Sequence, residues 1–275
     1  MSVLLGVAAA TGAALSFGTA DFAGGMISRR VGPLSAALAL QLISGAGLAI
    51  VLVATAQEVR PVAVGLGLTA GVCVAVGILA LYQALSSGAM GVVAVLAGVA
   101  ATATALAFDG IVGGRPPSAI QLGGIACAMA GAAASTRLAT VTFRVAAWSL
   151  VGGWAFGASF IAFNLATGQS VITVLFATRI AAAVLLGAIW ALRRGRRIPM
   201  NPLMGLAGAL DTLANLLMMV AVSLVPVSLA TAISSADPPI VTMFLARMVL
   251  GEALPRSAYL SVGLACAGIG LMVLG

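Results

Sequence analysis

Consecutive apolar runs of about 20 residues constrain this chain more than any other feature. A transmembrane helix needs about 20 apolar residues to cross a hydrocarbon core about 30 Å thick. Of the 275 residues, 62% are hydrophobic and only 7% are charged, whereas about 25% of the residues in a soluble domain are charged. Because these charges are too few to cover a globule of this size in water, we predict an all-α membrane protein with no soluble domain.

The hydropathy predicts ten membrane-spanning helices, separated by short breaks rich in arginine, glycine and proline. The first helix has no basic n-region and is too long for a signal peptide, so we expect it to stay in the membrane. The ten helices are expected at residues 2–27, 33–55, 62–85, 88–108, 117–136, 146–166, 170–192, 201–223, 226–248 and 257–275.

An internal repeat divides the chain into two halves. Residues 124–131 match residues 263–270 at five of eight positions, and the same offset of 139 aligns Phe17 with Phe156. A unit of five helices crosses the membrane an odd number of times, so the second copy must begin on the opposite side. We therefore predict two inverted five-helix repeats, an architecture usual in secondary transporters, at residues 1–137 and 144–275.

The distribution of arginine predicts the orientation. Ten arginines flank the predicted helices on one face and two, Arg60 and Arg115, on the other. The arginine-rich face should be cytoplasmic. We expect a multi-pass protein of a bacterial inner membrane with both termini on the non-cytoplasmic side.

Missing residue types exclude several chemistries. The chain has no lysine and no histidine, so it lacks a P-loop for ATP, an HExxH zinc site and a Ser-His-Asp triad. A proton relay would have to use carboxylates. Despite the net charge of +7, the arginines lie mostly at helix ends without interleaved aromatics, which argues against nucleic-acid binding. The three cysteines show no metal-binding spacing, and we expect no cofactor and no metal.

Each half begins with an aromatic-glycine pair, and the second half closes with Leu250-Gly251-Glu252 before a glycine-rich last helix. This pattern resembles the drug/metabolite transporter superfamily, and within it the EamA-type family of ten-helix carriers. The first half departs from it, with Gly114-Arg115 where the acid is usually found. The resemblance implies a basket of helices around a central cavity and carriage or export of small metabolites such as amino acids. Many members look as if both termini are cytoplasmic, and here we follow the arginine distribution instead.

Polar side chains deep in predicted helices are candidate site residues, because each costs about 2.5–3.5 kcal/mol at the bilayer centre. Asp21 lies one turn after Phe17. It is either a cavity carboxylate that binds a substrate amine or a proton, or an acid near the interface that is hydrogen-bonded to a neighbouring helix end. Asp211 and Asn215 are four residues apart on one helix face and should face a cavity or partner helices. We assign both, together with Asp21, to substrate binding, with interhelical hydrogen bonding as the alternative for Asp211 and Asn215.

Two further features of the second half stand out. Asp237-Pro238-Pro239 is expected to kink and break the ninth helix, and broken helices often mark a transporter's site. We assign Asp237 to substrate binding and the prolines to gating; the alternative is a structural kink. Arg179, in the middle of the seventh helix, needs one of the three deep aspartates as a partner. It is expected to form a structural ion pair, with anion recognition as the alternative.

Aromatic side chains are scarce, so their positions are informative. Phe156, Phe160 and Asn164 recur at helical spacing on the sixth helix, and Tyr82 lies near the end of the third. Such a stripe either packs against other helices or lines a site. We assign these residues, together with Phe17, to substrate binding.

These features predict a secondary transporter, not an enzyme, that works by alternating access without ATP. Its cavity should be lined by the first, third, fourth, sixth, eighth and ninth helices. We favour an amino acid, moved outward, as the small-molecule substrate, and the lipid bilayer as the other partner. A monomer is expected because one chain already contains two repeats. The alternatives are a sugar or nucleotide-sugar uptake carrier and an intramembrane aspartyl enzyme that uses Asp211 and Asp237.

Overall fold

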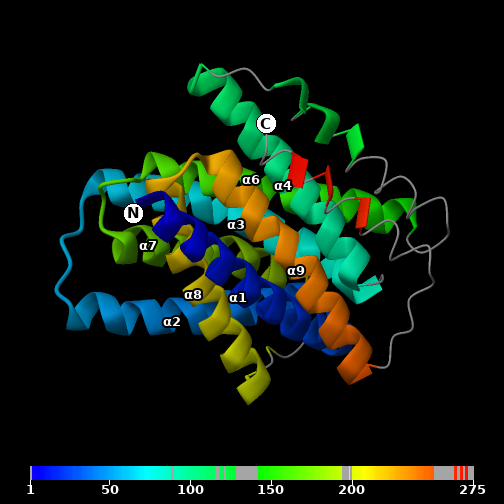
Figure 1. Ribbon diagram of the computed structural model, residues 1–275. Coiled ribbons are helices and arrows are strands. Elements are labelled where there is room, and N and C mark those ends of the chain that lie inside the picture. Colours follow the sequence, from blue (N-terminus) through cyan, green and yellow to red (C-terminus); the bar gives the residue numbers. More distant parts are fainter. Residues whose placement is uncertain are drawn as a thin grey trace.

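A computed structural model gives the fold (Figure 1). It describes residues 2–87, 90–114, 118–120, 122–124, 126–127, 142–193, 198, 200–250, 263–264, 267–268 and 270–271. All regular secondary structure in this part of the chain is helical. The described helices are α1 (Ser2–Val31), α2 (Pro33–Ala54), α3 (Pro61–Ser87), α4 (Met90–Val112), α6 (Phe143–Leu165), α7 (Val171–Leu192), α8 (Pro202–Leu224) and α9 (Val227–Leu250).

Seven of the described helices, α1, α2, α3, α4, α6, α7 and α8, are long and apolar enough to cross a membrane. This confirms a multi-pass, all-α membrane protein. The predicted count of ten helices is not confirmed, since residues 117–136 and 257–275 lie largely outside the described part of the chain.

Local sequence signals fix where several helices begin. The side chains of Thr142, Ser170 and Asn201 each accept a hydrogen bond from a backbone N–H three residues later. These caps satisfy donors that the first turn of a helix leaves unpaired. Proline occupies the first turn of α2 and α8, where its missing N–H removes no helical hydrogen bond.

Close helix contacts hold the bundle together. Helix α1 packs against α8 and α9, α3 packs against α6 and α7, α4 packs against α6 and α9, and α2 packs against α7 and α8. Glycine makes several of these contacts possible: a Cβ on Gly153 would meet the carbonyl oxygen of Ala97, and one on Gly71 would meet that of Thr178. Small residues at such seams are typical of membrane helices, because lipid provides no hydrophobic drive for their association.

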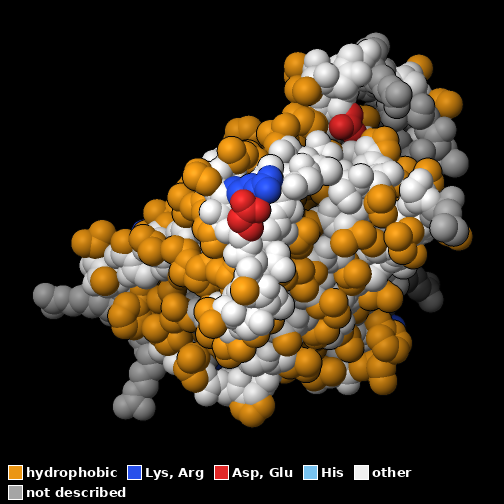
Figure 2. All heavy atoms as spheres, turned by 90° about the vertical axis from the view of Figure 1, so that its left-hand side faces the viewer, with side chains coloured by type: hydrophobic (Ala, Val, Ile, Leu, Met, Phe, Trp, Pro, Cys, Tyr) orange, Lys and Arg blue, Asp and Glu red, His pale blue; other side chains and the backbone are white. Residues whose placement is uncertain are grey.

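The outer surface is apolar. Figure 2 shows a face covered mainly by hydrophobic side chains, with charged side chains confined to small spots. Large apolar side chains such as Ile50 and Val53 on α2, and Val184 on α7, are 67–81% exposed. A soluble protein rarely exposes apolar surface so continuously, whereas such a surface is typical of a protein embedded in a lipid bilayer.

Helix α9 differs from the prediction in one respect. It continues without interruption through residues 237–239, so the two prolines do not break it. A proline removes only its own hydrogen bond and displaces one carbonyl, and neighbouring helices can compensate for that loss within a membrane.

Candidate functional site

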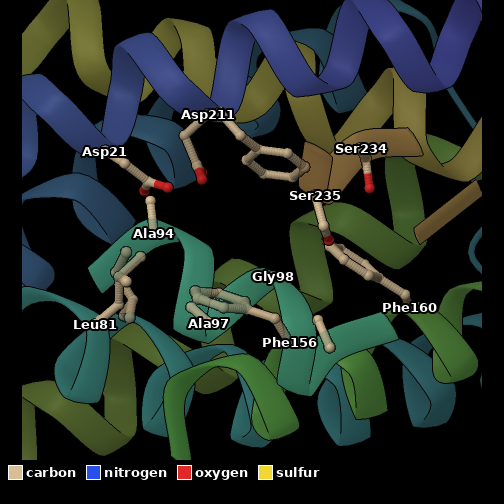
Figure 3. Close-up of a pocket in the computed structure, with 13 residues that line it drawn as sticks. Asp21, Leu81, Ala94, Ala97, Gly98, Phe156, Phe160, Asp211, Ser234 and Ser235 are labelled. Carbon is tan, nitrogen blue, oxygen red and sulfur yellow. The ribbon is translucent and has the colours of Figure 1, made fainter. Parts of the chain in front are cut away.

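A central cavity lies between six helices, α1, α3, α4, α6, α8 and α9, and encloses about 590 Å³ of empty space, its opening included. These are the six helices that the sequence predicted to line it. The lining is mostly apolar, with two carboxylates and two hydroxyls (Figure 3). It consists of Phe17, Asp21, Ile78, Leu81, Ala94, Ala97, Gly98, Ala101, Phe156, Phe160, Asp211, Ser234 and Ser235.

Asp21 reaches the cavity from the middle of α1. Its carboxyl group points into the same space as that of Asp211, across from Ala97 and Phe156 (Figure 3). The glycines that follow Asp21 allow close packing: a Cβ on Gly24 would collide with the ring of Tyr82 on α3. Gly24 therefore lets α1 pack closely against α3.

Asp211 belongs to a buried polar network behind the cavity wall. Its Oδ2 lies 2.6 Å from Nη2 of Arg179 on α7, and Nη1 of Arg179 donates to Oε1 of Gln41 on α2 at 3.0 Å. Arg179 is 1% exposed and Asp211 8%. Asn215, one turn along α8, donates to the backbone oxygen of Asp211 at 2.7 Å. The deep arginine thus has the acidic partner that its burial requires.

Three phenylalanines form the aromatic part of the lining. The rings of Phe17 and Phe160 are 6.0 Å apart, centroid to centroid, and tilted by 41°, within the range of favourable aromatic pairs. Phe156 packs over Gly77 of α3, where a Cβ would lie 3.1 Å from its ring. The predicted aromatic pairs at the start of the two halves therefore meet at one cavity.

Several predicted binding residues do not line the cavity. Tyr82 is fully buried against Gly24, and its hydroxyl finds no hydrogen-bond partner within the described residues. Asn164 donates to the backbone oxygen of Val222 on α8 at 2.8 Å, and Asn215 donates to the backbone oxygen of Asp211. Both asparagines satisfy backbone carbonyls, an interhelical or intrahelical role common among polar residues in membranes.

The side chains of Asp237, Pro238 and Pro239 lie outside the described residues, so their predicted roles in binding and gating stay predictions. Ser234 and Ser235, just before them, do line the cavity. A serine pair in an apolar run was the available signal for these two residues. Gln41 was also missed, although a glutamine in the middle of the second apolar run marks it in the same way.

Among the described residues, no three His, Cys, Asp or Glu side chains converge as a metal site. The cavity instead offers carboxylates, hydroxyls and aromatic rings, which suit a small organic ligand.

A comparison with protein families finds a match for the second half of the chain. Its residues 144–274 match the model of the EamA-like transporter family. Residues 144–274 are therefore similar to that family, which is part of the drug/metabolite transporter superfamily. The resemblance seen in the sequence is thereby confirmed, and the match suggests a membrane transporter of small metabolites.

Two further comparisons, with curated protein sequences and with solved structures, concern the whole chain. No curated protein sequence matches the chain. A solved structure, described only as "Crystal structure of protein", is similar with a TM-score of 0.68 and 15% identity. The match covers 99% of this chain and 97% of the other. At this identity the likeness concerns the fold alone.

Proposed function

We propose that this protein is a secondary transporter that exports small metabolites by alternating access, without ATP. We place it in a bacterial inner membrane with both termini on the non-cytoplasmic side. It consists, in this proposal, of two inverted repeats of five helices, residues 1–137 and 144–275. The observation that carries the proposal is the central cavity, which takes its lining from three helices of each half.

Contacts between repeat-equivalent residues support a two-fold axis. Under a two-fold rotation, a residue can touch its own equivalent only on the axis. Gln41 and Arg179, 138 residues apart, are hydrogen-bonded between α2 and α7. Gly98 of α4 and Ser235 of α9 are 137 apart, and a Cβ on Gly98 would lie 2.9 Å from the Ser235 oxygen. The thiol of Cys127 donates to the oxygen of Leu264, again 137 residues away, at 3.4 Å.

The direction of these pairs favours inversion. Further along α4, Asp109 Oδ2 accepts a hydrogen bond of 2.8 Å from the backbone N–H of Ser228 in α9. Residue numbers therefore increase along α4 while they decrease along the neighbouring part of α9, which means that the two helices run antiparallel. Equivalent helices that run antiparallel need an axis perpendicular to them, which lies in the membrane plane. An axis along the membrane normal would instead pair Asp109 with Ala246.

Cysteine cross-linking tests this architecture. In a background without the three native cysteines, Asp109→Cys combined with Ser228→Cys should form a disulfide under mild oxidation. Asp109→Cys combined with Ala246→Cys is the matched control, and should not. Cross-linking of only the control pair would refute the inverted arrangement.

The cavity chemistry supports a substrate with an amine. Asp21 is the proposed binding residue for a substrate amine or a proton, and Phe17, Phe156 and Phe160 would contact the apolar part of the substrate. Amino acids, the class that the resemblance implies, carry such an amine, and so do the amines derived from them. A sugar would need more hydrogen-bonding groups than this largely apolar lining provides.

The functional test is flux through purified protein in sealed lipid vesicles, measured with a panel of labelled amino acids, amines and sugars. Transport above that of empty vesicles, lost in Asp21→Asn, is the expected result. Two carboxylates at one cavity also suit an intramembrane aspartyl enzyme. Loss of peptide cleavage rather than flux in Asp211→Asn would favour that function and reject transport.

A further inference from the structure

The described lining of the cavity carries acidic side chains but no basic side chain. Asp21 and Asp211 both line it, and no arginine is among the described lining residues. Arg179 neutralises Asp211 at 2.6 Å, but it is 1% exposed and lies behind Asp211. A ligand in the cavity therefore meets the carboxylates, not the guanidinium.

Of the two cavity carboxylates, Asp21 is the one whose charge is not neutralised by a basic side chain within the described residues. Within the described part of the chain it makes no hydrogen bond and no ion pair, whereas Asp211 has both Arg179 and Asn215 beside it. An isolated carboxylate away from water is costly unless an opposite charge accompanies it. A cationic ligand would supply that charge.

A second polar group points to the same kind of ligand. Ser235 is 7% exposed and lines the cavity, and its hydroxyl makes no hydrogen bond within the described residues. Its oxygen is free to accept from an ammonium N–H. The rings of Phe17, Phe156 and Phe160 complete the wall, and aromatic faces attract cations as well as apolar groups.

From this arrangement we infer that the cavity selects an organic ammonium cation that carries no free carboxylate. The ammonium group pairs with Asp21, Ser235 offers a further acceptor in the wall, and the apolar body of the ligand contacts the phenylalanines. A carboxylate on the same ligand would face two aspartates with no exposed cation to pair with, and like charges brought together in an interface cost several kcal/mol. The inference narrows the substrate of the proposed transporter from amino acids to amines and carboxyl-blocked amino acids.

Four probes with one phenyl body separate the charge requirements. These are phenethylamine, phenylalaninamide, phenylalanine and phenylacetate, and their binding to the purified protein in lipid nanodiscs is measured by isothermal titration calorimetry. We expect phenethylamine and phenylalaninamide to bind at least about tenfold more tightly than phenylalanine, and phenylacetate to bind most weakly. Equal or tighter binding of phenylalanine, or no binding of any probe, overturns the inference.

Two variants test the assignment to Asp21. Asp21→Asn should weaken the binding of both cations at least about tenfold and reduce their advantage over phenylalanine. Asp109→Asn changes an acid outside the cavity that can still cap α9, and should leave the ratio unchanged. If Asp21→Asn retains wild-type affinity for the cations, the inference fails.

Flux of the same probes into vesicles separates this inference from the proposed function. Selective binding of the cations without any flux would refute transport and leave the inference standing. Flux that prefers phenylalanine to phenylalaninamide would support transport and refute the inference.

Discussion

The buried pair of Arg179 and Asp211 leads to an asymmetric prediction: removing the acid should be worse than removing the base. Asp211→Leu leaves a guanidinium that is 1% exposed and cannot lose its proton. Within the described part of the chain it then keeps Gln41 as its one partner. Arg179→Leu leaves a carboxylate that borders the cavity, with a side chain 12% exposed. Breaking a buried ion pair costs about 3–5 kcal/mol, so we expect about 5 kcal/mol for Asp211→Leu and about 3 kcal/mol for Arg179→Leu.

The double variant completes the cycle. Replacing both members with leucine leaves no uncompensated charge, and such replacements are often neutral or stabilising. We therefore expect the double variant to lie within about 1 kcal/mol of the parent. The effects of residues that do not touch add to within about 0.5 kcal/mol. The effects of these two substitutions on the unfolding free energy should therefore depart from additivity by much more than that.

The measurement is unfolding by SDS in mixed micelles, followed by circular dichroism. Arg193→Leu, at the exposed C-terminal end of α7, is the matched control and should change the unfolding free energy by less than about 0.5 kcal/mol. If both single variants are as stable as the parent, or if the double variant shows the sum of their effects, the pair does not act as a buried ion pair and the reasoning is refuted.

Three further predictions concern packing, topology and coupling. Gly71→Ala should lower the unfolding free energy by about 2 kcal/mol, because its Cβ meets the backbone of Thr178, whereas Gly65→Ala meets nothing within 4 Å and should be neutral or stabilising; equal effects would contradict the tight α3–α7 contact. A reporter fused after Gly275 should be active only outside the cytoplasm, and cytoplasmic activity would show that the arginine distribution misleads. If a proton drives transport, the parent's flux should respond to an imposed pH gradient and Asp21→Asn should not, while a parent whose flux ignores the gradient would exclude proton coupling.

The positions of the helices could be predicted because the thickness of the hydrocarbon core sets the length of each membrane-spanning run. A run long enough to cross the hydrocarbon core has to be helical, since every backbone polar group there must be satisfied within the segment. Residues 170–192 were expected and Val171–Leu192 is found. Helix α1 ends later than expected, at Val31 rather than residue 27. Arg29 stays helical there and donates from its Nε to the backbone oxygen of Leu85 at 3.2 Å.

The site was only partly predictable, because a sequence does not show how an apolar helix is rotated. Asp21 and Asp211 could be found, since a carboxylate in an apolar run must face something polar. Tyr82 was assigned to substrate binding but is not among the residues that line the cavity. Helix α3 is largely apolar on all sides, so its hydrophobic pattern does not define which face looks inward. Ala94 and Gly98 line the cavity, and neither a methyl group nor a residue without a side chain marks a binding site in a sequence.

The proposed repeat and the observed charges together suggest that the two end states of the transporter differ in energy. At the offset of 138 that relates Gln41 to Arg179, the counterpart of Asp211 is Cys73, and at the offset of 139 that aligns Phe17 with Phe156 the counterpart of Asp21 is Phe160. In the proposed repeat the helix scaffold is nearly symmetric, while its charged groups are not. Alternating access in an inverted repeat exchanges the conformations of the two halves, so a scaffold with symmetric charges would make its two end states equal in energy. Here the exchange instead changes the surroundings of an ion pair that has no counterpart in the other half. We expect one end state to be favoured when no substrate is bound, and cross-linking of the two ends of the cavity, with and without a cationic ligand, would measure that preference.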